Sequence, residues 1–143
     1  MLVKQISVFL ENKSGRLADV ADTLAKADVD IRALSIADTT DFGILRLIVN
    51  DPDKALRALN TEGFAVSTTD VIAVGIPDVP GGLARVLDFF REKAIDIEYL
   101  YAFITKYHDK ATVILKIDTT DEALHILKQH SIEVLEAKSV YGL

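Results

Sequence analysis

The sequence predicts an α+β protein built from two copies of one unit, each with the element order βαββαβ. Three observations predict this. The chain is similar to itself at an offset of 66 residues in the first half of each copy and 68 residues later. The matching positions include glycine and aspartate as well as apolar residues. Each copy also passes through strand-like and helix-like hydrophobic patterns in the same order. The matched pairs include Gly15 with Gly81, Asp22 with Asp88, Asp30 with Asp96, Ala55 with Ala123 and Leu59 with Leu127.

The first copy opens with a strand and a helix. Apolar residues at most even positions from 2 to 10 predict a half-buried strand, which ENKSG ends. A helix follows, for which Ser14 is the expected N-terminal cap, and it ends between Asp28 and Asp30. Its expected buried stripe is Leu17, Val20, Ala21, Leu24 and Ala27.

Residues 31–37 and 44–50 are the next two expected strands. Asp51-Pro52 then opens a second helix, because proline in a first turn removes only an N–H that has no helical partner. Gly63 is its expected end. The stripe of this helix is Ala55, Leu56 and Leu59, and residues 64–70 form the fourth strand.

The second copy repeats this order, and the result is the ferredoxin-like, or split βαβ, arrangement. Right-handed crossovers place both helices of a unit on one face of an antiparallel sheet, so we expect the other face to stay open. The expected strands are 71–76, 95–104, 111–118 and 132–140; the helices are one lined by Leu83, Val86, Leu87, Phe90 and Ala94, and one over 120–130.

We expect one domain over residues 1–70 and a second over 71–143. Neither Gly nor Pro occurs between Phe64 and Gly75, so the last strand of copy one should run directly into the first strand of copy two. A unit of about 70 residues buries only about 60% of its surface alone, so rigid packing of the two copies is expected.

Composition narrows the possible functions. The chain has 143 residues, 50% hydrophobic and 27% charged, which is typical of a globular protein. The absence of cysteine excludes disulfides and thiolate sites and fits a reducing compartment. A net charge of −6 does not favour binding to the negatively charged backbone of a nucleic acid. Lys4, Gln5 and Ser7 interrupt the N-terminal apolar run, so we expect no signal peptide, no membrane segment and a cytoplasmic protein.

No catalytic or cofactor-binding motif is found. The glycine-rich dinucleotide and phosphate motifs are absent. His125 and His130 are five apart on a helix, hence on different faces, and His108 lies in a hairpin. We expect these histidines to be solvated surface residues, and we expect no metal, no cofactor and no enzyme activity.

The loop between the first strand and first helix of each copy is the candidate binding site. The first loop contains Asn12, Lys13, Ser14, Gly15, Arg16 and Leu17; the second contains Asp78, Val79, Pro80, Gly81, Gly82 and Leu83. Glycine here either permits the tight turn or lets the backbone approach a ligand. A helix N-terminus attracts a carboxylate, Asn12 carries a donor and an acceptor, and Asp78 can hold an ammonium group. Such a site suits a zwitterion.

ENKSGRL and DVPGGL, each between an alternating strand and an amphipathic helix, resemble the ACT domain signature. The resemblance covers the chain twice, and residues 6–37 are especially similar to the small regulatory subunit of acetohydroxyacid synthase. It implies that a free L-amino acid binds near the loop-to-helix turn, often between two ACT units, and that Asn12 contacts it. Asp78 replaces Asn in copy two, and Ser14 stands where the family often has Pro.

Aromatic residues distinguish the second copy. Tyr99, Tyr101 and Phe103 lie on an expected edge strand. Such edges are usually covered, so these rings form either an interface or the wall of a ligand site. We take Tyr99 and Tyr101 as candidate ligand contacts and expect a homodimer that covers this edge.

The sequence thus predicts a non-catalytic amino-acid sensor that acts on a separate enzyme or regulator, or through its own assembly. The alternative is a regulatory subunit of an acetohydroxyacid synthase-like enzyme. An acylphosphatase-like enzyme would need an Arg–Asn pair around a phosphate-cradling loop, which we do not find. An RNA-binding sheet would need aromatics on its central strands, where the first strands offer only Phe9 on the open face.

Overall fold

The computed structural model describes residues 2–11, 13–38, 42–103, 106 and 108–143. These form two compact units. The N-terminal unit comprises Lys4–Thr69 with Tyr141–Leu143, and the C-terminal unit comprises Met1–Val3 with Asp70–Val140.

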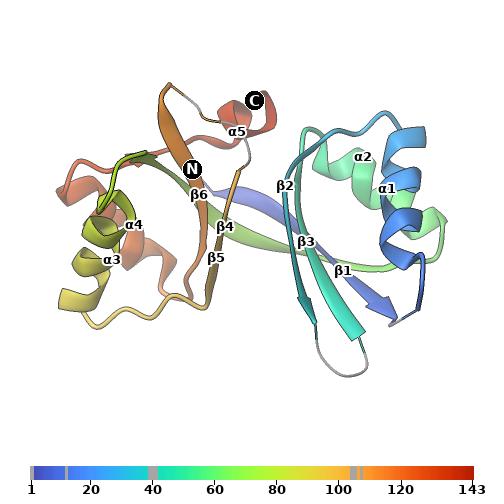
Figure 1. The fold of residues 1–143 in the computed structure, drawn as a ribbon, viewed down its shortest axis with the longest axis horizontal. Coiled ribbons are helices and arrows are strands. Elements are labelled where there is room, and N and C mark those ends of the chain that lie inside the picture. Colours follow the sequence, from blue (N-terminus) through green and yellow to red (C-terminus); the bar gives the residue numbers. More distant parts are fainter. Residues whose placement is uncertain (1, 12, 39–41, 104–105, 107) are drawn as a thin grey trace. The chain divides into compact units, whose positions relative to one another are not determined.

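The N-terminal unit is a four-stranded sheet with two helices on one face (Figure 1). Its sheet order is β2-β3-β1-β4, and β3 pairs antiparallel with both β1 and β2. Gly63, at φ +85°, follows the second helix and ends it as predicted. Its elements are β1 (Val3–Glu11), α1 (Arg16–Lys26), β2 (Ile31–Asp38), β3 (Phe42–Val49), α2 (Pro52–Thr61) and the first part of β4 (Ala65–Pro77).

The core of this unit lies between the helices and the sheet. Val20 and Leu24 of α1 are fully buried, as are Ala55 and Leu59 of α2. Each buried Val or Leu stabilises the unit by about 1.5–3 kcal/mol relative to an exposed side chain. On the sheet side the core contains Ile6, Val8, Leu10, Leu45, Leu47 and Val49.

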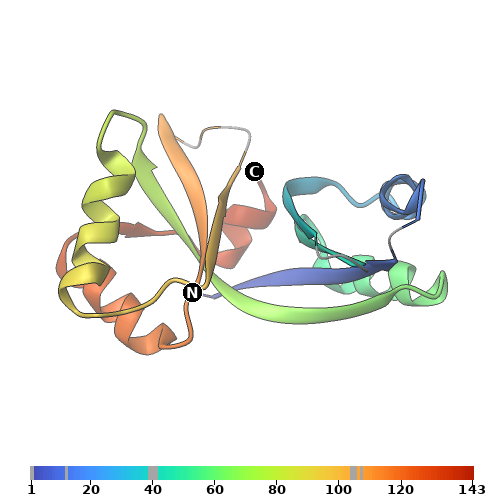
Figure 2. The same ribbon diagram turned by 60° about the horizontal axis from the view of Figure 1, so that its bottom comes forward.

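The C-terminal unit repeats this arrangement (Figure 2). Its strands stand in the order β7-β4-β6-β5, with antiparallel pairs throughout. Its elements are the last part of β4, α3 (Gly82–Glu92), β5 (Tyr99–Ala102), β6 (Lys110–Lys116), α4 (Thr120–Gln129), β7 (Glu133–Val134) and α5 (Ala137–Tyr141).

Strand β4 is continuous from Ala65 to Pro77, which confirms that the last strand of copy one runs into the first strand of copy two. Tyr141 returns to the N-terminal unit, where its hydroxyl accepts a hydrogen bond from Lys4 N at 2.9 Å and its carbonyl oxygen accepts one from Arg32 Nε at 3.2 Å. No helix in the described parts of the chain is long and apolar enough to cross a membrane.

Two expected strands are much shorter than predicted. Only Tyr99–Ala102 of residues 95–104 is a strand, and Ile104 lies outside the described residues. Ile95 and Ile97 pack on the core although no strand forms there, so their alternation misled the prediction. In 132–140, only Glu133–Val134 pairs with β4 before α5 begins.

Several details of the helix predictions are wrong. Ser14 is not the cap of α1; the N-cap is Gly15, without a side-chain hydrogen bond. Leu17 is 41% exposed and Leu83 is 37% exposed, because each lies in a first turn that projects beyond the sheet-facing stripe. Ala94 follows α3 in a left-handed conformation rather than lining the helix.

Two polar side chains of β1 contact each other on the sheet face opposite the helices. Gln5 Nε2 donates a hydrogen bond to Ser7 Oγ at 3.2 Å. The expectation that this face is open stays a prediction.

Candidate functional site

The two candidate loops have the same backbone geometry. Gly15 has φ +85° and Gly81 has φ +83°, and each is the N-cap of the helix that follows. Lys13 N donates to Glu11 O at 2.7 Å in the first loop, and Val79 N donates to Pro77 O at 2.9 Å in the second. The loops are therefore structural equivalents. Asn12 lies outside the described residues.

Conformation explains these two glycines, since nothing lies within 4 Å of a Cβ built on either of them. Positive φ is costly for other residues. Gly82 differs, because a Cβ there would overlap the carbonyl oxygen of Pro77. Of these three glycines, Gly82 alone shows a close backbone approach, and that approach is to the protein itself.

Each helix begins with free backbone donors. Asp19 N donates to Gly15 O at 2.9 Å, and this is the first helical hydrogen bond of α1. The N–H groups of Leu17 and Ala18 before it bond to no described residue. The N–H groups of Leu83 and Ala84 at the start of α3 likewise bond to no described residue. Such N–H groups and the helix dipole favour an anionic group.

A small cavity lies beside each loop. The cavity at the first loop has a volume of about 230 Å³, and that at the second about 210 Å³. Phe64 lines the first and Ile132 the second, and these are matching positions in the two copies. Sequence reasoning missed both residues, although the internal repeat aligns them at the end of each unit's second helix.

The first cavity is charged and aromatic. Arg16 contributes to its wall, and its guanidinium makes an ion pair with Asp19 at 3.3 Å. Glu11 also lines it and makes an ion pair with Lys13 at 2.9 Å, a hydrogen bond that lowers the pKa of Glu11. Phe9 and Phe42 complete the aromatic part of the wall.

The second cavity is mainly apolar, with Val79, Pro80 and Ile132 in its wall and Arg85 as its charged residue. Asp78, the residue expected to hold an ammonium group, makes an ion pair with Lys106 at 2.6 Å. The two cavities thus differ in charge although the backbone around them is the same.

The aromatic residues of β5 stand apart from this cavity. Tyr99 and Tyr101 have ring centroids 6.5 Å apart, and neither lines the cavity at the second loop. Tyr101 is buried and Tyr99 is half-buried. Tyr99 and Tyr101 therefore do not form part of the cavity at the second loop.

The histidines were expected to be solvated surface residues; His108 and His125 are exposed, and His130 is half-buried. The ring of His130 stacks on Phe89 with centroids 3.7 Å apart and an interplanar angle of 4°. Within the described ranges, no group of three or more His, Asp or Glu side chains could hold a metal ion.

The fold and the paired loops define a tandem of two ferredoxin-like units. The family model described as "ACT domain pair" matches residues 1–143, and the chain belongs to this family. The chain is 45% identical to protein BT0572 from Bacteroides thetaiotaomicron, with a TM-score of 0.93 over 100% of this chain and 98% of that one.

A more distant structure is the regulatory subunit of aspartate kinase from Thermus thermophilus, with 18% identity and a TM-score of 0.62 over 90% of this chain and 93% of that one. The corresponding subunit from Thermus flavus has 18% identity and a TM-score of 0.58, over 88% and 90%. At this identity the likeness shows the fold alone. No curated protein matches the chain. These comparisons do not support the finer resemblance to the acetohydroxyacid synthase subunit.

Proposed function

We propose that this ACT domain pair is a non-catalytic regulatory protein that binds a free L-amino acid at the strand-to-helix loops. The observation that carries the proposal is the repeated combination of a left-handed glycine, two free N–H groups at a helix start and a cavity beside them. The N–H groups suit the carboxylate of an amino acid, and the cavity suits a small side chain.

The first loop is the better candidate for a polar ligand. Its cavity is lined by Glu11 and Arg16, whose partners Lys13 and Asp19 would be replaced by the ammonium group and an acidic group of the ligand. Asp78 of the second loop, which is paired with Lys106, does not line the second cavity. An apolar amino acid fits the second cavity better, because Val79, Pro80 and Ile132 form much of its wall.

The signal would pass to a separate enzyme or regulator in the cytoplasm. Aspartate kinase regulatory subunits share the fold, which supports a regulatory role of this kind. The sequence resemblance gives an acetohydroxyacid synthase-like enzyme as the alternative partner. Co-purification with a large catalytic chain would distinguish this alternative from a stand-alone sensor. A homodimer would cover the edge strand β5, and sedimentation at micromolar concentration would detect it.

Thermal unfolding in the presence of each of the twenty amino acids tests the proposal. A ligand at about one hundred times its Kd stabilises the folded state by about 2.7 kcal/mol. We expect one or a few amino acids to raise the Tm by several degrees, at about 2–4 °C per kcal/mol. If none shifts the Tm, the proposal is wrong.

A further inference from the structure

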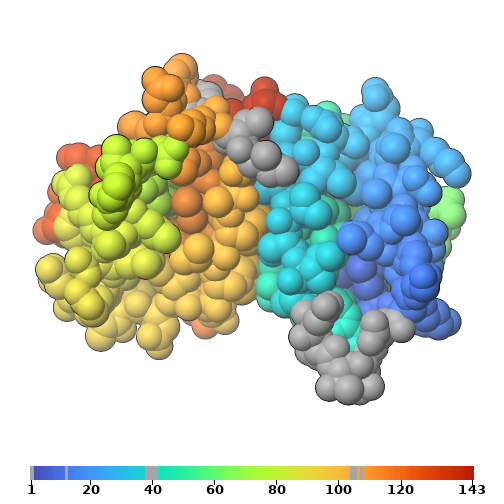
Figure 3. All heavy atoms as spheres, viewed as in Figure 1, coloured from blue at the N-terminus to red at the C-terminus, as the bar shows by residue number. Residues whose placement is uncertain are grey.

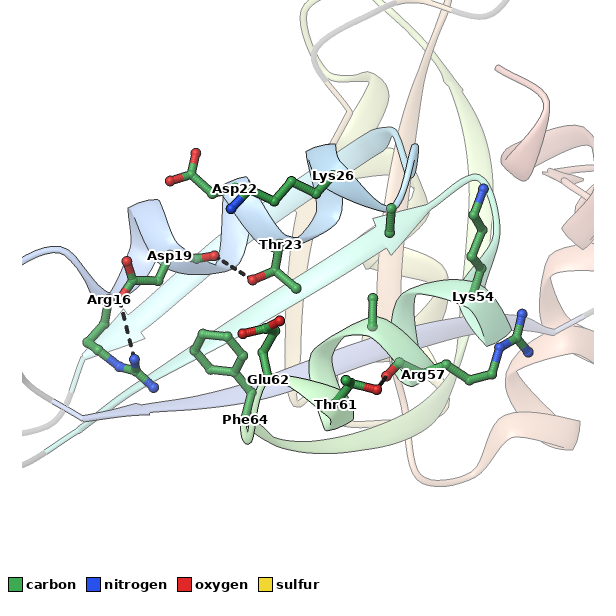
Figure 4. A pocket seen from close by; sticks show the side chains of 12 residues that line it. Arg16, Asp19, Asp22, Thr23, Lys26, Lys54, Arg57, Thr61, Glu62 and Phe64 are labelled. Atoms are coloured by element: carbon green, nitrogen blue, oxygen red, sulfur yellow. Dashed lines mark hydrogen bonds and ion pairs between the residues drawn. The ribbon is translucent and has the colours of Figure 1, made fainter.

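A second and larger cavity lies between the two helices of the N-terminal unit (Figure 4). This interhelical groove, between α1 and α2, has a volume of about 630 Å³. Small-molecule sites typically measure about 300–1,000 Å³. Arg16 and Phe64 line both the groove and the cavity beside the first loop, so the two are neighbours.

Cations without partners gather along the groove. Lys26 comes from the end of α1, Lys54 from the first turn of α2 and Arg57 from the middle of α2. None of these three side chains makes an ion pair or hydrogen bond with any residue that the structure describes. Arg16, by contrast, is paired with Asp19 at 3.3 Å. Three carboxylates line the groove as well: Asp19, which is paired with Arg16, and Asp22 and Glu62. The lining thus has four cations and three acids, and Lys54 and Arg57 form the end of the groove at which Figure 4 shows no carboxylate beside them.

The C-terminal unit serves as an internal control for this groove. Thr23 and Glu62 of the groove correspond to Phe89 and His130 in the second copy. There the two rings stack at 3.7 Å and bridge the corresponding helices α3 and α4. The same fold is therefore stable with this position filled, and the opening between α1 and α2 is a property of the first copy.

The charges of the two copies diverge in the same place. Lys26 and Lys54 correspond to Glu92 and Glu122, and Arg57 corresponds to His125. Since both units fold alike, packing does not dictate cations at these positions. Three cations lie in an open groove in a chain whose net charge is −6, and they are replaced by two acids and a histidine where the groove is filled.

We propose that the interhelical groove binds a small, multiply charged anion, a phosphate ester or a polycarboxylate, through Lys26, Lys54 and Arg57. Lysine and arginine form strong charge-assisted hydrogen bonds with phosphate and carboxylate oxygens. Long charged side chains around an open groove suit an anionic ligand better than an apolar one. The proposal does not depend on amino-acid binding at the loops.

Calorimetric titration of the full chain with pyrophosphate, ATP and citrate tests this site, and the three probes separate phosphate from carboxylate recognition. Lys26→Glu with Lys54→Glu introduces the residues that copy two carries at these positions. We expect this variant to weaken binding of the recognised anion about tenfold or more, because two attractive charges become repulsive. The amino-acid response of the Tm should persist.

Two further variants make the test specific. Lys128→Glu with Lys138→Glu makes the same change of net charge on exposed lysines outside the groove, and it should leave affinity within about twofold because distant surface charges are screened. Thr23→Phe with Glu62→His places the Phe–His pair in the first copy and should abolish binding. Melting curves of each variant report folding, and the lysine pair still tests the site if the filled variant does not fold.

The proposal is overturned if none of the three anions binds at millimolar concentration. It is equally overturned if the control pair loses as much affinity as Lys26→Glu with Lys54→Glu, or if the folded Thr23→Phe, Glu62→His variant binds as before. Binding of a glutamate-rich peptide without binding of any small anion would also overturn it and would indicate a protein-docking surface instead.

Discussion

The guanidinium of Arg16 lies over the ring of Phe64, with Cζ 4.5 Å from the ring centroid. Arg16 is the first residue of α1, and Phe64 is a buried core residue just before β4. The contact fixes the start of the helix, and with it the first loop, against the core of the N-terminal unit. Arg16 Nε is buried and has no hydrogen-bond partner among the described residues.

Replacing Arg16 tests this contact. A partly exposed cation–π contact is worth about 0.5–1 kcal/mol, and the covering hydrocarbon stem adds packing. We expect Arg16→Ala to lower the Tm, by about 2–4 °C for each kcal/mol of unfolding free energy that is lost. Arg16→Met is the matched control, because it keeps the stem and removes the charge, and it should recover part of the loss. Equal melting of wild type and Arg16→Ala would show that the contact is energetically silent.

The left-handed turn at Gly15 makes a second prediction. Gly15→Val should destabilise the protein by about 1–3 kcal/mol, because a β-branched residue is strained at positive φ. Nothing lies within 4 Å of the new Cβ, so crowding adds no cost. Gly15→Asn should cost much less, since Asn tolerates this conformation. Denaturant unfolding measures both, and similar losses for Val and Asn would point to crowding rather than to φ.

The continuity of β4 across the two copies was predictable because the sequence has neither Gly nor Pro between Phe64 and Gly75. The end of copy two was not predicted, although a signal was present. Val134 and Leu135 are adjacent apolar residues, which breaks the alternation of a strand. Leu135 N still donates to Ala73 O at 2.8 Å, and Val140 N then donates to Glu136 O, so the chain turns into α5.

The candidate loops were predictable from local sequence, and their surroundings were not. Gly15 and Gly81 indicate a strand-to-helix turn from local sequence alone, independently of tertiary contacts. The contact between Arg16 and Phe64, and the different wall at Ile132, join residues that are far apart in sequence. Exposure at the surface is likewise a tertiary property. Leu34 and Ile36 are exposed because β2 is an edge strand, which lies at the surface of its unit in Figure 3.

Glu11 offers a test by pH. Its hydrogen bond and ion pair with Lys13 hold the pKa of the carboxyl below its ordinary value. The folded pKa is therefore lower than the unfolded one, so this stabilisation is present above the unfolded pKa and is lost as pH falls through the folded pKa. NMR titration should show that Lys13→Ala raises the pKa of Glu11. Lys26→Ala is the control and should leave it unchanged; a pKa unaffected by Lys13→Ala would exclude the pair as its cause.

The last prediction concerns Asn12, which matches the ligand-contacting position implied by the ACT resemblance, whereas Asp78 in the second copy does not. If Asn12 contacts the amino acid, Asn12→Ala should reduce affinity about tenfold, since a hydrogen bond to a charged group is worth about 1.5–3 kcal/mol. The Tm of the free protein should barely change, because the turn depends on Gly15. Calorimetry with the amino acid found by thermal unfolding measures the affinity, and Asp78→Ala is the comparison in the second loop. A larger loss for Asp78→Ala would move the site to the second loop. Unchanged affinity in Asn12→Ala, with a lowered Tm, would make Asn12 a turn residue.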